Sequence, residues 1–481
     1  MHHELLVVLI LLFVVILVHS VSARLRVSFP ILLVLVGLAS SFLPELSHVA
    51  LEPELIFLIF LPPLLYEAAW FTSWREFKRL RGAISLQAGG LIFFTAGAVA
   101  LVAHAVIPGC SWALGFLLGG IVAPPDAVAA TSVLHGLRIP RISVAVLEGE
   151  SLVNDATSLI VVRFALAAIA TGAFVLEQAA LQLLWVSVAG VATGLVIAHL
   201  LVVLHRFLRA APEVDTALTL LTPYLMYVAA ERVEASGVLA VVAGGLYLSA
   251  RSRHFLGARA RVFAAGTWAT VTFVLNGLVF ILIGLQLPAV TADLGGLSLL
   301  QASGLGLGIS AAVIVVRVVW TFPAAYLPSF MPWKPKPRRF PDWKTVTLVG
   351  WAGMRGVVSL AAALAIPVTL DSGAPFPLRS LLVFITFVVI LVTLVAQGLS
   401  LPWLVRRLRF DLPDDAQRRR ELLEAQLSAH VAALPPGRAR LVAAREELLR
   451  LRDAGDVAHE LARARELELD LELARHEPSG H

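Results

Sequence analysis

The sequence predicts an all-α membrane protein that crosses the bilayer many times. Of its 481 residues, 58% are apolar and only 15% are charged, whereas a typical soluble protein has roughly 25% charged residues. The mean hydropathy is +0.85. A soluble protein of this composition would expose large apolar patches, and a disordered chain would have far fewer apolar residues. Because helices satisfy their own backbone hydrogen bonds in lipid, a polytopic helical membrane protein remains.

Thirteen apolar runs account for the predicted crossings. A helix needs roughly 17–25 residues to span the hydrocarbon core. The eighth and ninth runs are short, so a total of 12 also stays open. In chain order the runs lie at 4–20, 27–43, 54–70, 83–107, 112–134, 143–170, 179–207, 215–230, 236–250, 262–287, 300–328, 343–367 and 380–404.

Basic residues in the short loops indicate the orientation. With 13 crossings, the loops on one side hold 19 Lys and Arg residues, whereas those on the other side hold only Arg232 and Arg379. Positive loops stay in the cytoplasm, so we expect the N-terminus outside and the C-terminus inside a bacterial inner (plasma) membrane. The formal net charge of +5 lies mainly in these loops, and no nucleic-acid partner is expected. A single cysteine, Cys110, excludes an intrachain disulfide and a cysteine metal site.

The composition changes abruptly near residue 406. We therefore expect a transmembrane domain at 1–405 and a charged cytoplasmic tail at 406–481. The tail is rich in Arg, Glu, Leu and Ala with apolar residues at helical spacing, and Pro435-Pro436-Gly437 divides it into two helical pieces. A solvated helical hairpin that caps the cytoplasmic face is the expected structure, and a regulatory or dimer-contacting role is the alternative.

Ionisable residues inside the apolar runs mark a candidate functional site. Each costs at least about 2.5–3.5 kcal/mol to place in a bilayer, so such residues are functional candidates. Glu67 lies in the third run, Asp126 in the fifth and Arg355 in the twelfth. Glu148, Glu150, Asp155, Arg163 and Arg317 also fall within runs.

The sixth run carries a polar stripe, within the sequence LEGESLVND at 147–155. Ser151 and Asp155 are four residues apart, as are Glu150 and Asn154, so the two pairs share one side of a helix. Carboxylate, hydroxyl and amide oxygens suit hard cations such as Na⁺, and the stripe has no His or Cys for a transition metal. A polar seam that only joins helices is the other interpretation.

Two runs contain residues that interrupt a helix. The fifth has Pro124 and Pro125 directly before its Asp, and the twelfth has Gly353 and Gly356 on either side of its Arg. Broken helices at membrane depth are tolerated where they line a cavity. The two interrupted runs are seven apart, so runs 1–6 and 8–13 would form two six-helix repeats of opposite orientation. The sequence thus predicts discontinuous helices 5 and 12 at a transport site.

Four of these segments together resemble a known family. LPPLLYEAA at 61–69, APPDAVAA at 123–130, LEGESLVND at 147–155 and GMRGVVS at 353–359 are similar to motifs of the bacterial sodium/proton antiporters of the monovalent cation:proton antiporter superfamily. More narrowly, the chain resembles the electroneutral sodium/hydrogen exchanger branch, which has an Asn-Asp pair at the site. The resemblance covers about residues 1–405.

The resemblance implies a role for each site residue. Asp155 would bind the cation or the proton, with Asn154 as its amide partner. Ser151, Asp126 and Glu67 would be further ligands or neighbours of the site. A bound Na⁺ or other monovalent cation would contact the carboxylates of Asp155 and Glu67 and the hydroxyl of Ser151.

The resemblance also implies structural roles. Glu150 and Arg355 are expected to form an ion pair that joins the sixth and twelfth runs. Pro125 stands where the family often has Thr, so one hydroxyl ligand is missing. Runs 4–6 and 11–13 would belong to a core bundle, and the remaining runs would form a scaffold that contacts a second copy in a homodimer.

The predicted activity is secondary antiport of Na⁺, with Li⁺ and K⁺ as further cargo, against H⁺. A carboxylate in a partly dry cavity holds a proton or a cation but not both, so competition at Asp155 and alternating access would give electroneutral 1:1 exchange. No nucleotide-binding motif is visible, and no cofactor is expected. K⁺/H⁺ exchange is the main alternative, and a cation channel would share the buried carboxylates without needing the coupling. An intramembrane enzyme would need a nucleophile and base that the motifs lack.

Overall fold

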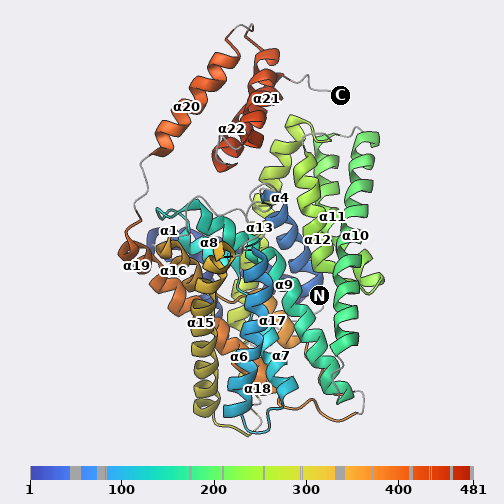
Figure 1. Cartoon of the computed structure of the whole chain (residues 1–481), viewed down its shortest axis with the longest axis vertical. Coiled ribbons are helices and arrows are strands. Elements are labelled where there is room, and N and C mark those ends of the chain that lie inside the picture. Colours follow the sequence, from blue (N-terminus) through green and yellow to red (C-terminus); the bar gives the residue numbers. More distant parts are fainter. Residues whose placement is uncertain are drawn as a thin grey trace.

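The protein is built from helices (Figure 1). The computed structural model describes residues 2–25, 27–43, 56–72, 78, 82, 84–172, 176–208, 211–252, 255–292, 294, 296–330, 342–370, 373–410, 415–432, 434, 436–454 and 459–476. Within these ranges the β pairing is limited to an isolated bridge between Thr369 and Pro375. The predicted all-α fold class is confirmed.

Many of the helices are long and apolar enough to cross a membrane. Among the described residues, seven such segments lie at Leu86–Val106, Trp112–Leu134, Ile142–Thr171, Leu181–Leu208, Ala258–Thr291, Leu299–Leu327 and Arg379–Leu408. Shorter apolar helices lie at Leu6–Ser22, Phe29–Ser40, Phe57–Phe71 and Gly237–Arg251. The molecule is a polytopic membrane protein, while the total of 13 crossings and the inverted repeat stay predictions.

The larger of the two main hydrophobic cores in the apolar part of the chain joins helices from both ends of the chain. In it α6 packs on α7, and α15 packs on α6, α16 and α18. Short helix α14 (Leu287–Thr291) also contributes to it. The other members are α1 (His2–Leu25), α2 (Phe29–Ser40), α6 (Leu91–Val106), α7 (Trp112–Val122), α8 (Ala127–Leu134), α15 (Leu299–Phe330), α16 (Trp343–Trp351), α17 (Val357–Leu364), α18 (Arg379–Val392) and α19 (Gly398–Leu408).

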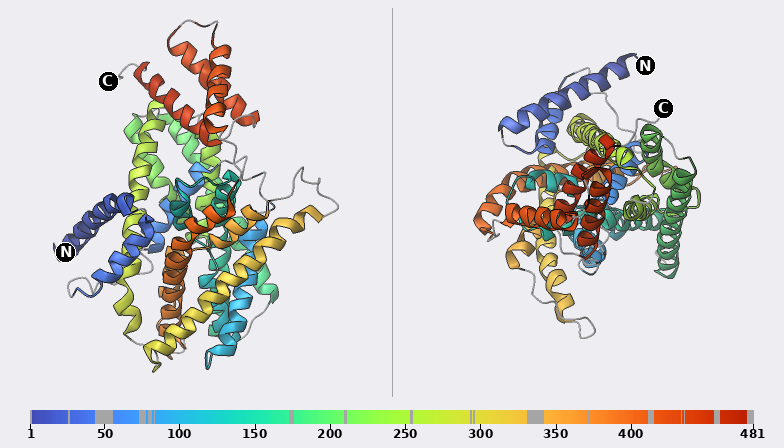
Figure 2. Two further views of the ribbon diagram at one scale, coloured as in Figure 1. Left: turned by 90° about the vertical axis from the view of Figure 1, so that its left-hand side faces the viewer. Right: turned by 90° about the horizontal axis from the view of Figure 1, so that it is seen from above.

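A second core lies beside the first. It is formed by α4 (Leu61–Phe71), α10 (Leu176–Leu208), α11 (Pro212–Arg232) and α12 (Gly237–Arg251). Helices α9 (Arg141–Thr171) and α13 (Ala258–Leu285) contribute side chains to both cores. Figure 2 shows α1 at one edge of the molecule and the α10–α12 group at another. The polar stripe of α9 therefore runs along the boundary between the two cores.

Two helical segments are interrupted in mid-course, as predicted. α7 ends at Val122 and α8 begins at Ala127, so residues 123–126 are not helical. α16 ends at Trp351 and α17 begins at Val357, which leaves 352–356 without helical structure. Consecutive prolines in the first break and closely spaced glycines in the second explain both interruptions.

Glycines let two pairs of helices meet backbone to backbone. A Cβ added at Gly37 of α2 would overlap with the Ile281 carbonyl oxygen of α13, and one at Gly284 with the Val34 carbonyl oxygen of α2. A Cβ at Gly194 of α10 would overlap with the Ala240 carbonyl oxygen of α12. Small residues at helix contacts are the usual means of close packing in membranes.

The charged tail forms three helices beyond the apolar part of the chain, at the top of Figure 1. They are α20 (Asp415–His430), α21 (Arg438–Ala454) and α22 (His459–His476), and α22 packs against α13. The prediction of two helical pieces is corrected, because the second piece divides between α21 and α22. The helices α21 and α22 pack against each other.

Several of the basic residues used to predict the orientation lie outside the described residues. These are Arg26, Arg75, Arg79, Arg81, Arg209, Arg253, Lys334, Lys336, Arg338 and Arg339.

Candidate cation-binding site

The two helix breaks contact each other and hold each other in place. The backbone N–H of Asp126 donates to the Met354 carbonyl oxygen at 2.7 Å. In the opposite direction, Arg355 donates from Nε to the Val122 carbonyl oxygen at 2.8 Å and from Nη2 to the Ala123 carbonyl oxygen at 3.2 Å. The broken backbones leave carbonyl groups without helical partners, and a fully buried guanidinium satisfies them.

Asp126 caps the helix that follows the first break. Its Oδ1 accepts hydrogen bonds from the backbone N–H groups of Val128 at 2.8 Å and Ala129 at 3.3 Å. A carboxylate at this position also compensates the positive end of the α8 dipole. A Cβ added at Gly356 would overlap with the Asp126 carboxylate, so only glycine allows this close approach of the two breaks.

The polar stripe of α9 faces the first break. The Ser151 hydroxyl accepts from the Ala127 N–H at 3.5 Å, and Asn154 Nδ2 donates to the Pro125 carbonyl oxygen at 3.4 Å. Asn154 is fully buried, and its Oδ1 has no hydrogen-bond partner among the described residues. The Asp155 side chain is 6% exposed. The residues singled out on α9 are thus attached to, or lie next to, the non-helical backbone at 123–126.

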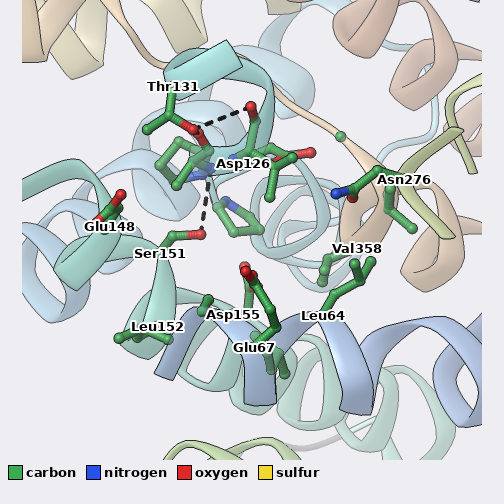
Figure 3. A pocket seen from close by; sticks show the side chains of 18 of the residues that line it. Leu64, Glu67, Asp126, Thr131, Glu148, Ser151, Leu152, Asp155, Asn276 and Val358 are labelled. Atoms are coloured by element: carbon green, nitrogen blue, oxygen red, sulfur yellow. Dashed lines mark hydrogen bonds between the residues drawn. The ribbon is translucent and has the colours of Figure 1, made fainter. Parts of the chain in front are cut away.

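These elements enclose a cavity of about 380 Å³. Its lining includes the carboxylates of Asp155, Asp126 and Glu67 and the hydroxyl of Ser151, together with Gly356 at the second break (Figure 3). Glu67 is supplied by α4, in the second core, whereas the other residues are supplied by α9 and by the breaks at 123–126 and 352–356. The cavity therefore lies where the two cores meet.

Sequence reasoning assigned no specific role to four polar residues that line this cavity. Glu148 was marked only as an ionisable residue of the sixth run, and Thr131, Asn276 and Ser359 are also part of the wall. Glu148 precedes Ser151 by one turn of α9 and is exposed, whereas Asp155 lies deeper. The i, i+3 spacing of Glu148 and Ser151 places both on one side of α9 and could have indicated that Glu148 belongs to the site. Thr131, Asn276 and Ser359 lie on other helices, so sequence spacing does not relate them to the stripe.

The predicted ion pair between Glu150 and Arg355 is wrong. The Glu150 carboxylate accepts from Arg317 of α15, with Oε1 to Nη1 at 2.7 Å and Oε2 to Nη2 at 3.1 Å. Both side chains are 0% exposed. The guanidinium of Arg355 instead donates hydrogen bonds to backbone carbonyl oxygens, including that of Gly353. Arg317, which the sequence left without an assigned partner, thus joins α15 to α9.

The acidic residues line the cavity without forming a metal centre. Among the described residues, no group of three or more His, Cys, Asp and Glu side chains converges closely enough to hold a metal ion. The wall combines carboxylates with several hydroxyl groups and the amide of Asn276. This donor set suits a hard monovalent cation that enters and leaves.

Comparison with known proteins relates the whole apolar part of the chain to one family. The family described as sodium/hydrogen exchanger, transmembrane, matches residues 8–407. An uncharacterized Na⁺/H⁺ exchanger of Mycobacterium tuberculosis is 36% identical over 437 residues, which cover 89% of this chain and 79% of the relative. The sodium, potassium, lithium and rubidium/H⁺ antiporter of Bacillus subtilis is 33% identical over 407 residues, covering 82% and 61% of the two chains.

The fold is also found among solved structures. The sodium proton antiporter MjNhaP1 of Methanocaldococcus jannaschii at pH 8 aligns with a TM-score of 0.62 over 83% of this chain and 97% of that one, at 17% identity. This likeness concerns the fold, whereas the sequence match concerns the family. On the match over residues 8–407, this chain belongs to the transmembrane sodium/hydrogen exchanger family.

Proposed function

We propose that this protein exchanges Na⁺ for H⁺ across a bacterial inner membrane, with one cation and one proton competing for Asp155. Membership of the exchanger family and relatives named Na⁺/H⁺ antiporters support the reaction. The observation that carries the assignment of the site is the position of Asp155. This buried carboxylate lines the cavity at which two broken helical segments and both hydrophobic cores meet.

Competition at one carboxylate provides the coupling. A bound proton neutralises the side chain and removes the charge that attracts a cation, while a bound cation excludes the proton. If only Asp155 changes state, each cycle carries one positive charge in each direction and the exchange is electroneutral. Asp126 keeps its hydrogen bonds to the α8 N-terminus in both states and sets the local field.

The surrounding groups supply the remaining cation ligands. Ser151 Oγ lies one helical turn before Asp155, and Glu67 reaches the cavity from α4 (Figure 3). Asn154 holds the stripe against the break through the Pro125 carbonyl group. Because Glu67 lies on α4 and Asp155 on α9, movement between the two cores would separate these ligands and release the ion, as alternating access requires.

Potassium is the second candidate cargo, alone or together with sodium. The Bacillus subtilis relative is named for Na⁺, K⁺, Li⁺ and Rb⁺. Pro125 offers only its carbonyl oxygen at the break, and that oxygen already accepts from Asn154. Selectivity between hard cations depends on cavity size and ligand number, so the missing hydroxyl at this position bears on the choice between Na⁺ and K⁺. The proposal also includes an outside N-terminus, the cytoplasmic domain at 406–481 and a homodimer.

The test is cation-driven proton flux in proteoliposomes that contain a pH-sensitive dye. Na⁺, Li⁺ and K⁺ are added in turn to vesicles with the wild type or with Asp155→Asn. We expect Na⁺ to alkalinise the lumen of acid-loaded vesicles, and Asp155→Asn to abolish this response. The rate of this response should be the same with and without a clamp of the membrane potential at zero by K⁺ and valinomycin, because the exchange moves no net charge.

Glu213→Gln is the matched control. Glu213 is an exposed carboxylate in the first turn of α11, away from the cavity, and its removal should leave the flux unchanged. Flux that survives Asp155→Asn would move the site to another carboxylate. Flux that depends on the membrane potential would contradict 1:1 exchange, and no response to any of the three cations would contradict antiport itself.

A further inference from the structure

A cluster of polar side chains lies on an outer face of the second core, apart from the cation cavity. Tyr247 Oη of α12 lies 2.9 Å from His199 Nδ1 of α10 and accepts from Arg251 Nη1 at 2.5 Å. The guanidinium carbon of Arg251 is also 4.4 Å from the centre of the Tyr247 ring. Tyr247 thus holds both basic side chains in fixed positions.

The alignment of α10 and α12 adds a second arginine to this cluster. The two helices run side by side in the same direction, with Gly190 against Ser236, Gly194 against Ala240 and His199 beside Tyr247. Arg251 is therefore level with residues 203–205 of α10. Arg206 lies one to three residues further on, which corresponds to about 1.5–4.5 Å along the axis. His199 and Arg206 are seven residues apart and share one side of α10.

The basic side chains of this cluster have hydrogen-bond donors beyond those that contact Tyr247. His199, Arg206 and Arg251 are exposed. No carboxylate lies within ion-pair distance of Arg206 or Arg251 in the part of the chain that the structure describes. A guanidinium on a lipid-facing helix lacks water on its apolar side, so an anionic partner with several acceptor oxygens would stabilise it.

The surface around the cluster is apolar. On α10 the side chains of Val196, Leu200, Val203 and Phe207 are 58%, 60%, 51% and 83% exposed. α10 lies at the edge of the molecule, where Figures 1 and 2 both show no further helix outside it. Basic and aromatic side chains at the end of such an apolar surface are typical of the membrane interface.

We propose that His199, Tyr247, Arg251 and Arg206 bind the phosphate of an anionic phospholipid whose acyl chains lie along the apolar side of α10. Arg251 presents its unused Nε and Nη2 donors, the His199 ring presents Nε2 because Nδ1 faces Tyr247 Oη, and Arg206 adds charge. The phosphodiester supplies the acceptors, and the fixed Tyr247 ring reduces the entropy lost on binding.

The experiment is native mass spectrometry of the full chain in detergent, titrated with phosphatidylglycerol or phosphatidylcholine. We expect phosphatidylglycerol to bind more tightly than phosphatidylcholine. Arg251→Gln should weaken phosphatidylglycerol binding by about tenfold, the scale of one charge-assisted hydrogen bond, and Tyr247→Phe should have a smaller effect.

Arg24→Gln is the matched control. Arg24 is an exposed arginine in the last turn of apolar helix α1, far from the cluster in sequence, and its loss should leave lipid binding unchanged. Equal weakening by Arg24→Gln and Arg251→Gln would overturn the site, as would equal binding of the two lipids. If glycerol phosphate binds as tightly as the lipid, the ligand of this site would be a soluble phosphate and not a phospholipid. Loss of a dimer in Arg251→Gln with unchanged lipid binding would assign this face to a second copy of the chain.

Discussion

The ion pair between Glu150 and Arg317 contains two fully buried charges that do not face the cation cavity. Their removal from water is expensive, and the cost is offset only while both partners are present. The pair joins α9, which carries the site residues, to α15 of the larger core. Its role is to position α9 rather than to bind the transported ion.

Removing one partner should destabilise the protein, and removing both should restore much of the loss. Glu150→Gln leaves Arg317 as an unpaired buried charge, at a cost of about 3–5 kcal/mol. The double variant Glu150→Gln/Arg317→Met should be more stable than Glu150→Gln alone in thermal unfolding followed by size-exclusion chromatography in detergent. Glu150→Gln/Arg355→Met is the comparison, and rescue by that variant instead would contradict the pairing seen in the structure.

Single residues differ in how well the sequence predicts their contacts. Asp155, Asp126 and Ser151 could be found because carboxylates and a hydroxyl inside apolar runs are costly, and spacing places two of them on one side of a helix. The partner of Glu150 could not be found in this way. Arg317 and Arg355 are both buried arginines, and only the tertiary structure decides which one reaches a carboxylate and which one reaches carbonyl groups.

At the scale of elements, the two helix breaks form one unit. Arg355, in the second break, satisfies carbonyl groups of the first, and the N–H of Asp126 satisfies a carbonyl group of the second. The Arg355 N–H also donates to Thr393 Oγ1 at 3.0 Å, just beyond α18. Prolines and glycines in the sequence predict where each helix stops, but not that the two broken ends exchange hydrogen bonds.

Arg355→Lys should therefore impair transport although it keeps the charge. A lysine ammonium cannot present the planar set of donors that reaches the carbonyl groups of Val122, Ala123 and Gly353. Each charge-assisted hydrogen bond contributes about 1.5–3 kcal/mol, so the loss of one should lower Na⁺-driven proton flux by at least about tenfold. Arg407→Lys, an exposed arginine near the end of α19, is the control and should retain full flux. Equal flux in both variants would show that the forked geometry is not needed.

At the scale of the whole molecule, the tail is attached to the apolar part by ion pairs. Arg261 of α13 contacts Asp470 of α22 through Nε at 2.8 Å and Nη2 at 2.5 Å. Arg445 of α21 contacts the same carboxylate at 2.9 Å, and it also donates to Glu466 at 2.7 Å. The tail helices have a small apolar core of their own. The expectation of a solvated hairpin that caps the cytoplasmic face did not name these contacts, since the sequence contains no signal that connects Arg261 with residues more than 200 positions away.

Acid should loosen the tail through Glu447. Hydrogen bonds from Arg450 at 2.6 and 2.7 Å hold the pKa of Glu447 below its usual value, although burial acts in the opposite direction. A carboxylate with a lowered pKa in the folded state stabilises it above the unfolded pKa, and this contribution is lost as the pH falls through the folded pKa. We expect the amides of α21 to exchange faster between about pH 5 and pH 3, after correction for intrinsic rates.

The variants separate this effect from a general effect of acid. Glu447→Gln should raise exchange in α21 already at neutral pH and should flatten its pH dependence. Glu446→Gln changes an exposed neighbour on the same helix and should behave like the wild type. A steep acid response that persists in Glu447→Gln would assign it to another group.

The sequence predicts the overall fold better than it predicts which helices pack together. Apolar runs and two interrupted segments were sufficient for an all-α membrane protein with a site between broken helices, because lipid permits few other structures. The grouping of the helices into two cores, with α9 and α13 in both, depends on contacts between residues far apart in the chain. Hydropathy reports only that a residue is buried, not which helix buries it.

The backbone contacts of α2 with α13 and of α10 with α12 limit which substitutions this chain can accept during evolution. At Gly37, Gly284 and Gly194 even a methyl group has no room, because the obstacle is the neighbouring main chain and cannot change its rotamer. At Leu200 or Phe207, by contrast, many apolar side chains are interchangeable. Intolerance to mutation in this protein should therefore not be equated with ion transport, since some of its least replaceable positions have no chemistry at all.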